Sequence, residues 1–172
     1  TERLREILRQ FSGLEVMVIG DLIIDEYITC DPLGMSQEDP TIVVQPVDSQ
    51  RFVGGAGIVA AHAAGLGASA QLLSVVGADP EAGFAGSRLT DYGVQPILVE
   101  DATRPTTLKT RYRCQGKTLL RVSRLHQSAI SAELRSGVAH RAANLGKCPQ
   151  LIVFSDFNYG VLPQDLVTDL TG

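Results

Sequence analysis

A chain of 172 residues with 44% hydrophobic residues and 17 glycines is long enough to bury a core and has a composition typical of globular α/β proteins. Its net charge of −4 at pH 7 excludes the broad positive surface that binds nucleic acids or anionic membranes non-specifically. These values predict one domain, with any anionic ligand recognised by a local site.

The cysteines and the N-terminal segment indicate the cellular compartment of the protein. Cys30, Cys114 and Cys148 are odd in number and widely spaced, and they form neither a CxxC pair nor a zinc-ligand pattern. A reducing cytoplasm is therefore expected. Residues 1–11 place apolar side chains at helical spacing among charges, which predicts an amphipathic helix and not a signal peptide. No apolar run approaches the about 18 residues of a membrane span.

Short apolar runs alternate with helical patterns along most of the chain. The runs are typical of strands buried on both faces of a parallel sheet, and they cover residues 15–20, 70–76, 95–99 and 151–154. Helices are predicted over residues 55–66, 80–92 and 131–145, and Asp79 and Ser131 are N-cap candidates for the last two. This alternation predicts a three-layer α/β fold with a parallel sheet.

Two segments interrupt the alternation. Residues 27–52 contain three prolines and the β-branched run TIVV, and residues 106–125 alternate polar and apolar side chains around a Gln115–Gly116 turn. We expect both to form strands outside the main sheet, as a small β-lid over its edge. Pairing with another subunit is an equally good use of such strands.

Asp21 and Asp25 follow directly after the first predicted strand, in the segment GDLIID. Because ligands of open α/β sheets bind at the carboxyl ends of strands, these short carboxylates are well placed to accept hydrogen bonds from a polyol. The alternative is that both cap turns and bond local backbone amides. The residues alone support the two interpretations equally.

Glycine-rich and basic segments are further candidates for ligand contacts. Glycines in the segment GGAG at residues 54–57 would let backbone N–H groups approach a ligand, although a tight helix crossing explains them equally well. Lys109, Arg111 and Arg113 share one face of an alternating strand, where a guanidinium could grip a phosphate. For most basic residues of this hairpin, protection of an exposed edge is the favoured interpretation. A dinucleotide-binding protein is disfavoured, because neither GxGxxG after the first strand nor a P-loop is present.

In their order along the chain, these elements resemble the N-terminal part of the PfkB, or ribokinase-like, carbohydrate kinases. The resemblance is strongest to the heptose 7-phosphate kinases of ADP-heptose synthesis. The segments that carry it are VMVIGDLIIDEY, DPLGMSQEDPTIVV, FVGGAGIVAAHAAGLG, GADPEAGFAGSRLTDYGV, PTTLKTRYR and FSDFNYGVL. The resemblance implies a ribokinase-like core with a β-lid, in a cytoplasmic kinase that transfers the γ-phosphate of MgATP to a sugar or sugar phosphate.

The resemblance also implies roles for particular residues. Asp25 would hold sugar hydroxyls, and Gly54 and Gly55 would let the backbone close over the sugar. Lys109 and Arg111 would face a substrate phosphate. No metal ligand is implied within the chain.

Asp156 would lie at the floor of the cleft, near the sugar and the nucleotide. Three positions depart from the pattern: Ile58 replaces a sugar-binding asparagine, Tyr159 replaces a lysine of the heptose kinases, and Ser123 replaces an acidic residue. An aliphatic side chain cannot replace the hydrogen bonds of an amide. The identity of the sugar is therefore left open.

Members of the family continue for roughly as long again, into a GAGD-type motif that supplies the anion hole and the catalytic base. We therefore expect residues 1–172 to be an N-terminal, sugar-binding portion without a catalytic residue, inactive by itself. The parent would use ATP and Mg²⁺ and would form a homodimer through the lid. The alternative is a catalytically silent ribokinase-like module for binding or dimerisation, which Ile58 favours.

Overall fold

One of two β-sheets, here called the main sheet, contains the four predicted parallel strands. In a computed structural model that describes residues 2–144, 146 and 148–171, these are β1 Glu15–Gly20, β4 Ser69–Val76, β5 Val94–Glu100 and β8 Leu151–Ser155. All neighbours pair in parallel, in the order β5-β4-β1-β8. Met17, Val18 and Ile19 of β1 are fully buried, since helices cover both faces of the sheet.

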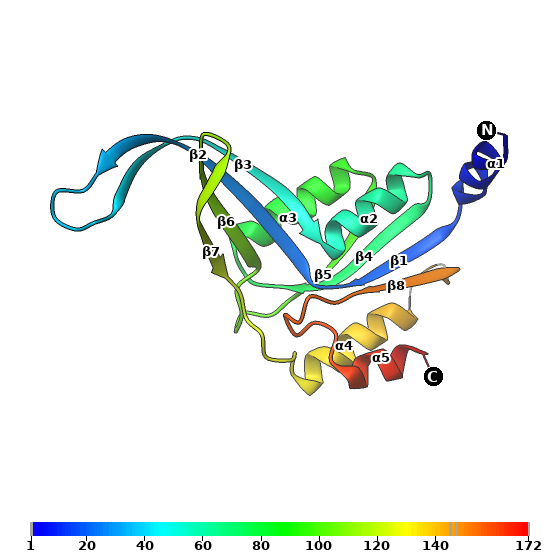
Figure 1. Ribbon diagram of the computed structural model, residues 1–172. Helices are drawn as coiled ribbons and strands as arrows, with labels where there is room; N and C mark the ends of the chain where they lie inside the picture. Colours follow the sequence, from blue (N-terminus) through cyan, green and yellow to red (C-terminus); the bar gives the residue numbers. More distant parts are fainter. Residues whose placement is uncertain (1, 145, 147, 172) are drawn as a thin grey trace.

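Four helices form the two outer layers (Figure 1). Helices α2 Ala56–Gly65 and α3 Pro80–Asp91 lie on one face, and α4 Ala132–Ala143 and α5 Gln164–Thr171 lie on the other. Successive residues of a strand point to opposite faces of the sheet. Leu72 packs in the core under α2 and α3, and Leu73 packs in the core under α4 and α5. The predicted three-layer α/β architecture is confirmed.

Both predicted N-caps are present. The Asp79 carboxylate accepts the backbone N–H of Ala82 at 3.1 Å, and the Ser131 hydroxyl accepts that of Leu134 at 3.2 Å. Helix α4 ends at Ala143, and Leu145, the predicted end, lies outside the described residues.

Helix α5 was not predicted, and it follows Pro163 with three apolar residues at helical spacing. Helix α1 Glu2–Phe11 matches the expected amphipathic helix, yet it buries none of its residues and leaves Leu4 56% exposed. It lies at the opposite end of the molecule from the β2–β3 hairpin (Figure 1). None of the helices in the described ranges is long and apolar enough to cross a membrane.

The interrupting segments form a second sheet. Its strands are β2 Leu22–Met35, β3 Ile42–Gly55, β6 Thr107–Cys114 and β7 Lys117–Arg124, in the order β3-β2-β6-β7. The β6–β7 hairpin matches its prediction, with the turn at Gln115 and Gly116. The other hairpin is longer than residues 27–52, and its far end projects from the body (Figure 1).

The chain continues as a strand almost directly after β1. β1 ends at Gly20 and β2 begins at Leu22, so only Asp21 separates the two sheets. Ile23 and Ile24 continue as strand because they pair with Gly54 and Val53 of β3. The second sheet therefore starts at the carboxyl end of a central strand of the first.

Asp79 joins the two sheets, and its replacement tests this connection. Its second carboxylate oxygen accepts the backbone N–H of Thr106, which leads into β6, at 2.8 Å. Asp79→Ala should lower the free energy of unfolding by about 2 kcal/mol, because a helix cap and a second hydrogen bond are lost. Ser131→Ala removes only a cap and should cost about 1 kcal/mol. Urea denaturation measures both, and equal losses would contradict the connecting role.

Candidate functional site

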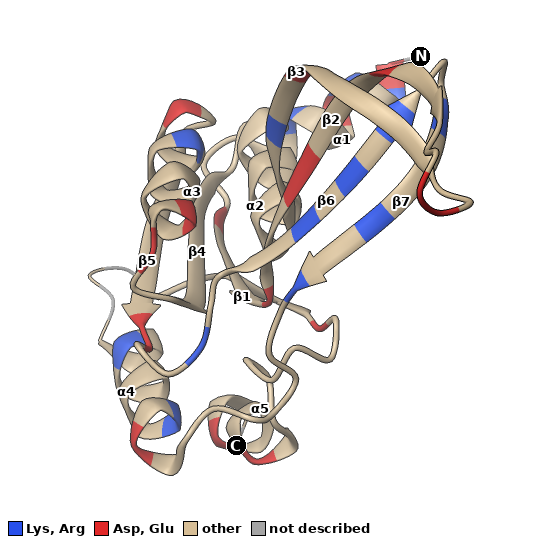
Figure 2. Cartoon of the chain, turned by 90° about the vertical axis from the view of Figure 1, so that its left-hand side faces the viewer, with Lys and Arg blue, Asp and Glu red and all other residues tan. Residues whose placement is uncertain are grey.

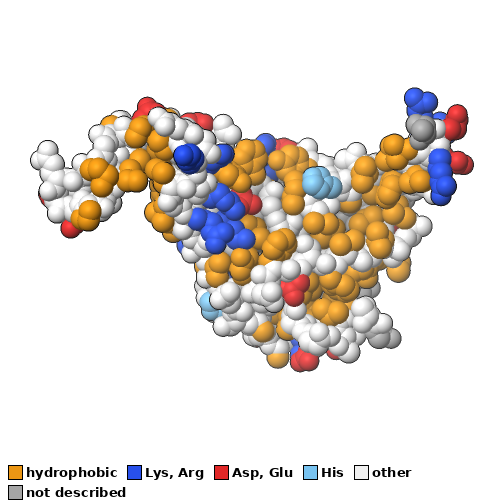
Figure 3. Space-filling view, viewed as in Figure 1, with side chains coloured by type: hydrophobic (Ala, Val, Ile, Leu, Met, Phe, Trp, Pro, Cys, Tyr) orange, Lys and Arg blue, Asp and Glu red, His pale blue; other side chains and the backbone are white. Residues whose placement is uncertain are grey.

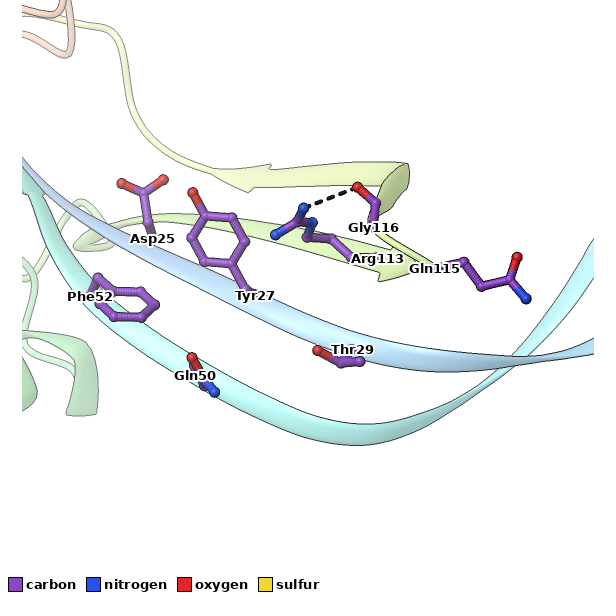
Figure 4. A pocket seen from close by; sticks show the side chains of 8 residues that line it. All are labelled: Asp25, Tyr27, Thr29, Gln50, Phe52, Arg113, Gln115 and Gly116. Atoms are coloured by element: carbon purple, nitrogen blue, oxygen red, sulfur yellow. Dashed lines mark hydrogen bonds between the residues drawn. The ribbon is translucent and has the colours of Figure 1, made fainter.

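A cavity of about 630 Å³ lies on one face of the second sheet (Figure 4). Its lining residues come from β2, β3 and the β6–β7 hairpin: Asp25, Tyr27, Thr29, Gln50, Phe52, Arg113, Gln115 and Gly116. Asp25, Tyr27 and Thr29 of β2 contribute together, because side chains alternate between the faces of a strand. The Tyr27 and Phe52 rings meet edge to face with centroids 5.9 Å apart, so part of the wall is aromatic.

Asp25 is paired with Arg111 beside this cavity. The Arg111 guanidinium donates a short hydrogen bond to Asp25 Oδ1 and lies 5.2 Å from the centroid of the Tyr27 ring. The two charged side chains are 24% and 23% exposed, so solvent reaches both. The hydrogen bond that Arg111 donates to Asp25 raises the pKa of Arg111 above its ordinary value. A ligand hydroxyl that bonds to Asp25 would therefore share this carboxylate with the guanidinium of Arg111.

The glycine pair is explained by close packing around the two aspartates. A Cβ atom on Gly54 would overlap Oδ2 of Asp25, so glycine leaves room for this carboxylate. Gly55 has a φ of +56°, and a Cβ there would overlap the carbonyl oxygen of Asp21. Ala56 N–H donates to the same carbonyl at 2.9 Å. Gly54 thus lies against Asp25, whereas Gly55 lies against Asp21.

Asp21 has a different role from Asp25. Its carboxylate is buried and accepts the backbone N–H groups of Phe157 at 2.7 Å, Tyr159 at 3.1 Å and Val161 at 3.2 Å. Burial raises the pKa of Asp21 despite these hydrogen bonds, which act in the opposite direction. The backbone-bonding interpretation thus holds for Asp21, although its partners are remote in sequence, and Asp25 alone is open to a ligand.

Lys109 lies next to the loop that Asp21 holds. Its ammonium is 5.8 Å from the centroid of the Phe157 ring and 5.0 Å from that of Tyr159, within cation–π range. Lys109 pairs with Asp25 in the register of β2 and β6, so this contact connects the loop to the site.

Asp156 stands apart from the other candidates. Its carboxylate is exposed, accepts the backbone N–H of Asn158 at 2.7 Å, and is not among the groups that line the cavity. The structure thus brings Asp25, Gly54 and Arg111 together and leaves Asp156 on the loop after β8.

Sequence reasoning missed most of the cavity wall. Tyr27, Thr29, Gln50 and Phe52 were assigned to an insertion without further roles, although Asp25, Tyr27 and Thr29 show the alternation of a strand face. Figure 2 shows the Lys and Arg residues of β6 and β7 opposite the acidic residues of β2. Across the described ranges, no group of three or more His, Cys, Asp and Glu side chains is placed to hold a metal ion.

A three-layer α/β body with a parallel sheet and a second β-sheet at its strand ends is the ribokinase-like fold. The family model described as pfkB family carbohydrate kinase matches residues 14–171, and the chain belongs to this family. Ile58, which replaces the expected asparagine, lies half-buried in the first turn of α2.

Relatives and solved structures agree with this assignment. The chain is 33% identical over 161 residues to the bifunctional protein HldE of Desulfatibacillum aliphaticivorans, and 35% identical over 169 residues to that of Caulobacter vibrioides. These matches cover 93% and 96% of the chain, which spans about a third of each relative's length (33% and 34%).

Two solved kinases show the same fold. A putative phosphofructokinase from Staphylococcus aureus matches with a TM-score of 0.67 and 13% identity, over 90% of this chain and 48% of its own. Phosphofructokinase-2 from Escherichia coli, solved in complex with fructose-6-phosphate, matches with a TM-score of 0.64 and 14% identity. This match covers 92% of the present chain and 50% of the E. coli chain.

The carboxyl groups around the second sheet make stability depend on pH. Burial raises the pKa of Glu26, but hydrogen bonds from Arg51 and Thr110 outweigh it, so the net pKa lies below its ordinary 4.5. For Asp79 and Asp101, hydrogen bonds likewise outweigh burial and place the pKa below 3.8. A lowered pKa in the folded state stabilises the protein above the unfolded pKa, and this contribution is lost as the pH falls.

The free energy of unfolding should therefore decrease as the pH falls from about 5 to about 3. The raised pKa of Asp21 works in the opposite direction, because its contribution falls as the pH rises above 3.8. Glu26→Gln should make the acid loss smaller, whereas Glu100→Gln, at an exposed position of β5, should leave it unchanged. Urea denaturation at several pH values measures this dependence, and identical pH profiles for wild type and Glu26→Gln would contradict it.

Proposed function

We propose that this chain is the sugar-binding part of an ATP-dependent kinase that phosphorylates a sugar or a sugar phosphate, with heptose 7-phosphate as one candidate. The observation that carries this proposal is the cavity at Asp25, in a chain of the pfkB family. A carboxylate with a free face and an aromatic wall beside it suits a polyhydroxylated ring, which has both hydroxyl and apolar faces.

The charges of the site fit the same substrate class. Asp25 accepts hydroxyl hydrogens, while Gly54 and Gly55 keep the backbone close to the ring. Lys109 and Arg111, which were expected to face a substrate phosphate, add positive charge next to the Asp25 carboxylate. The fructose-6-phosphate complex of phosphofructokinase-2 supports a phosphorylated sugar as substrate.

ATP, with Mg²⁺, supplies the transferred phosphoryl group in this proposal. The base and the anion hole would come from protein outside residues 1–172, so the present chain alone would not catalyse transfer. Asp156, on the loop at the carboxyl end of the main sheet, would lie near the sugar and the nucleotide. The cytoplasm, where ATP is available, is the proposed location.

A second candidate function is a catalytically silent module for binding or dimerisation. Ile58 favours it, because an aliphatic side chain cannot bond sugar hydroxyls. The second sheet favours it too, because it exposes many apolar side chains: Leu33, Met35, Ile42, Val43, Val47, Leu119, Leu120 and Val122. Figure 3 shows apolar side chains along the β2–β3 hairpin. We also propose a homodimer through this sheet, which is compatible with either function.

The role of Asp25 can be tested by binding. Calorimetry with a panel of sugars and sugar phosphates should detect a ligand whose affinity falls by about tenfold or more in Asp25→Ala, because hydrogen bonds to a charged acceptor are lost. Asp31→Ala, at an exposed position of the same strand, should bind as wild type does. Equal affinities of wild type and Asp25→Ala would contradict the assigned role.

Kinetics of the full-length protein separate the two functions. A kinase consumes ATP with at least one sugar or sugar phosphate, and Asp25→Ala should raise its KM. A silent module that binds sugar shows affinity without turnover, and a pure assembly module binds no sugar. Absence of turnover with every compound of the panel would overturn the kinase proposal.

The dimer proposal predicts a specific sensitivity to charge. Ile42→Glu, at a side chain that is 56% exposed in β3, should shift the protein from dimer to monomer, since a carboxylate would be buried in the interface. Leu4→Glu in α1 changes an equally exposed side chain (56%) and should leave the dimer intact. Sedimentation velocity gives both masses, and a monomeric wild type would refute the proposal.

A further inference from the structure

Three cations on one face of β6 differ in what they contact. Lys109 lies over two aromatic rings, and Arg111 is paired with Asp25. Arg113 donates one hydrogen bond, from Nη2 to the carbonyl oxygen of Gly116 at 3.0 Å, and no carboxylate in the described parts of the chain pairs with it. Of these three side chains, only Arg113 lines the cavity.

The position of the Arg113 guanidinium is fixed by its neighbours. It lies 5.7 Å from the centroid of the Tyr27 ring, and Figure 4 shows it between Tyr27 and the turn at Gly116. Tyr27 follows Asp25 by two residues on the same strand face, which corresponds to roughly 7 Å along the strand. The guanidinium and the Asp25 carboxylate thus line the same cavity, with Tyr27 between their positions along β2.

Arg113 has unused capacity for an anion. A guanidinium carries five N–H donors in a rigid fork, and the hydrogen bond to Gly116 uses one side of it. Such a fork matches phosphate oxygens in bidentate geometry. Because Arg111 is neutralised by Asp25, the positive charge that a ligand meets at the far end of the cavity is that of Arg113.

We propose that Arg113 binds the phosphate of a phosphorylated sugar whose hydroxyls are held by Asp25, and so makes the site selective for sugar phosphates over neutral sugars. The inference rests on the proposed function of the same site. The ring would lie against Phe52 and Tyr27, with its phosphate directed toward the β6–β7 turn. Arg111 then orients the Asp25 carboxylate, and Lys109 stays with the aromatic loop.

Calorimetry of the protein with matched ligand pairs tests this selectivity. The pairs are ribose and ribose 5-phosphate, fructose and fructose 6-phosphate, and sedoheptulose and its 7-phosphate, with glucuronate as a carboxylate probe. In at least one pair the phosphate should bind about tenfold or more tightly than the sugar, because charged hydrogen bonds are added. Glucuronate should bind more weakly than that phosphate, since it has one charge and fewer acceptor oxygens.

Two substitutions of Arg113 and a control at Arg121 then test whether Arg113 causes the preference. Arg113→Gln should reduce the preference for phosphate to near one while the affinity for the neutral sugar stays the same. Arg113→Lys keeps the charge and should retain a smaller preference, because an ammonium cannot bond in bidentate fashion. Arg121→Gln makes the same charge change on the neighbouring strand, outside the cavity lining, and should keep the wild-type ratio.

The outcomes separate this inference from the function beneath it. An unchanged ratio in Arg113→Gln, equal affinity of wild type for sugar and phosphate, or tighter binding of glucuronate would overturn the role of Arg113 and leave the sugar kinase standing. Binding of neither member of any pair would overturn both.

Discussion

The arrangement of the two sheets depends on one buried carboxylate. Asp21 is the single residue between β1 and β2, and its backbone N–H donates to Ser155 while its carbonyl accepts from Ala56. Its side chain holds three further amides of the loop after β8. One residue thereby joins the end of β8, the start of α2 and the root of the second sheet. A buried carboxylate is costly unless its hydrogen bonds are satisfied, which makes this junction specific.

The binding face follows from that junction. β2 starts at the strand ends of the main sheet, and Asp25 follows Asp21 by four residues along it. Because side chains alternate along a strand, Tyr27 and Thr29 lie on the same face as Asp25. The parallel pairing of β2 with β6 then sets three cations along this face at successive levels. Their neighbours give them different tasks, since the aromatic loop takes Lys109 and Asp25 takes Arg111. In our proposal, Arg113 then meets the charge of the substrate.

Local signals allowed much of the fold to be predicted. The apolar runs, the caps at Asp79 and Ser131 and the hairpin turn at Gln115 act over a few residues, so the sequence displays them directly. The site was predictable only in part. Asp25 and Gly54 were identified as candidates, but nothing local distinguishes Asp25 from Asp21, because the partners of Asp21 lie 136 to 140 residues away.

The sequence by itself determined the class of fold, the family and the presence of a β-lid with carboxylates and cations, because periodicity and ordered motifs are local properties of a chain. Only the tertiary structure decided which charges remain open to a ligand. Arg111 and Arg113 look equivalent on an alternating strand, but the register of β6 against β2 places them opposite Tyr27 and Thr29, and only Arg111 donates a side-chain hydrogen bond to Asp25. Long-range pairing of this kind depends on the packing of the whole sheet, so no short segment encodes it.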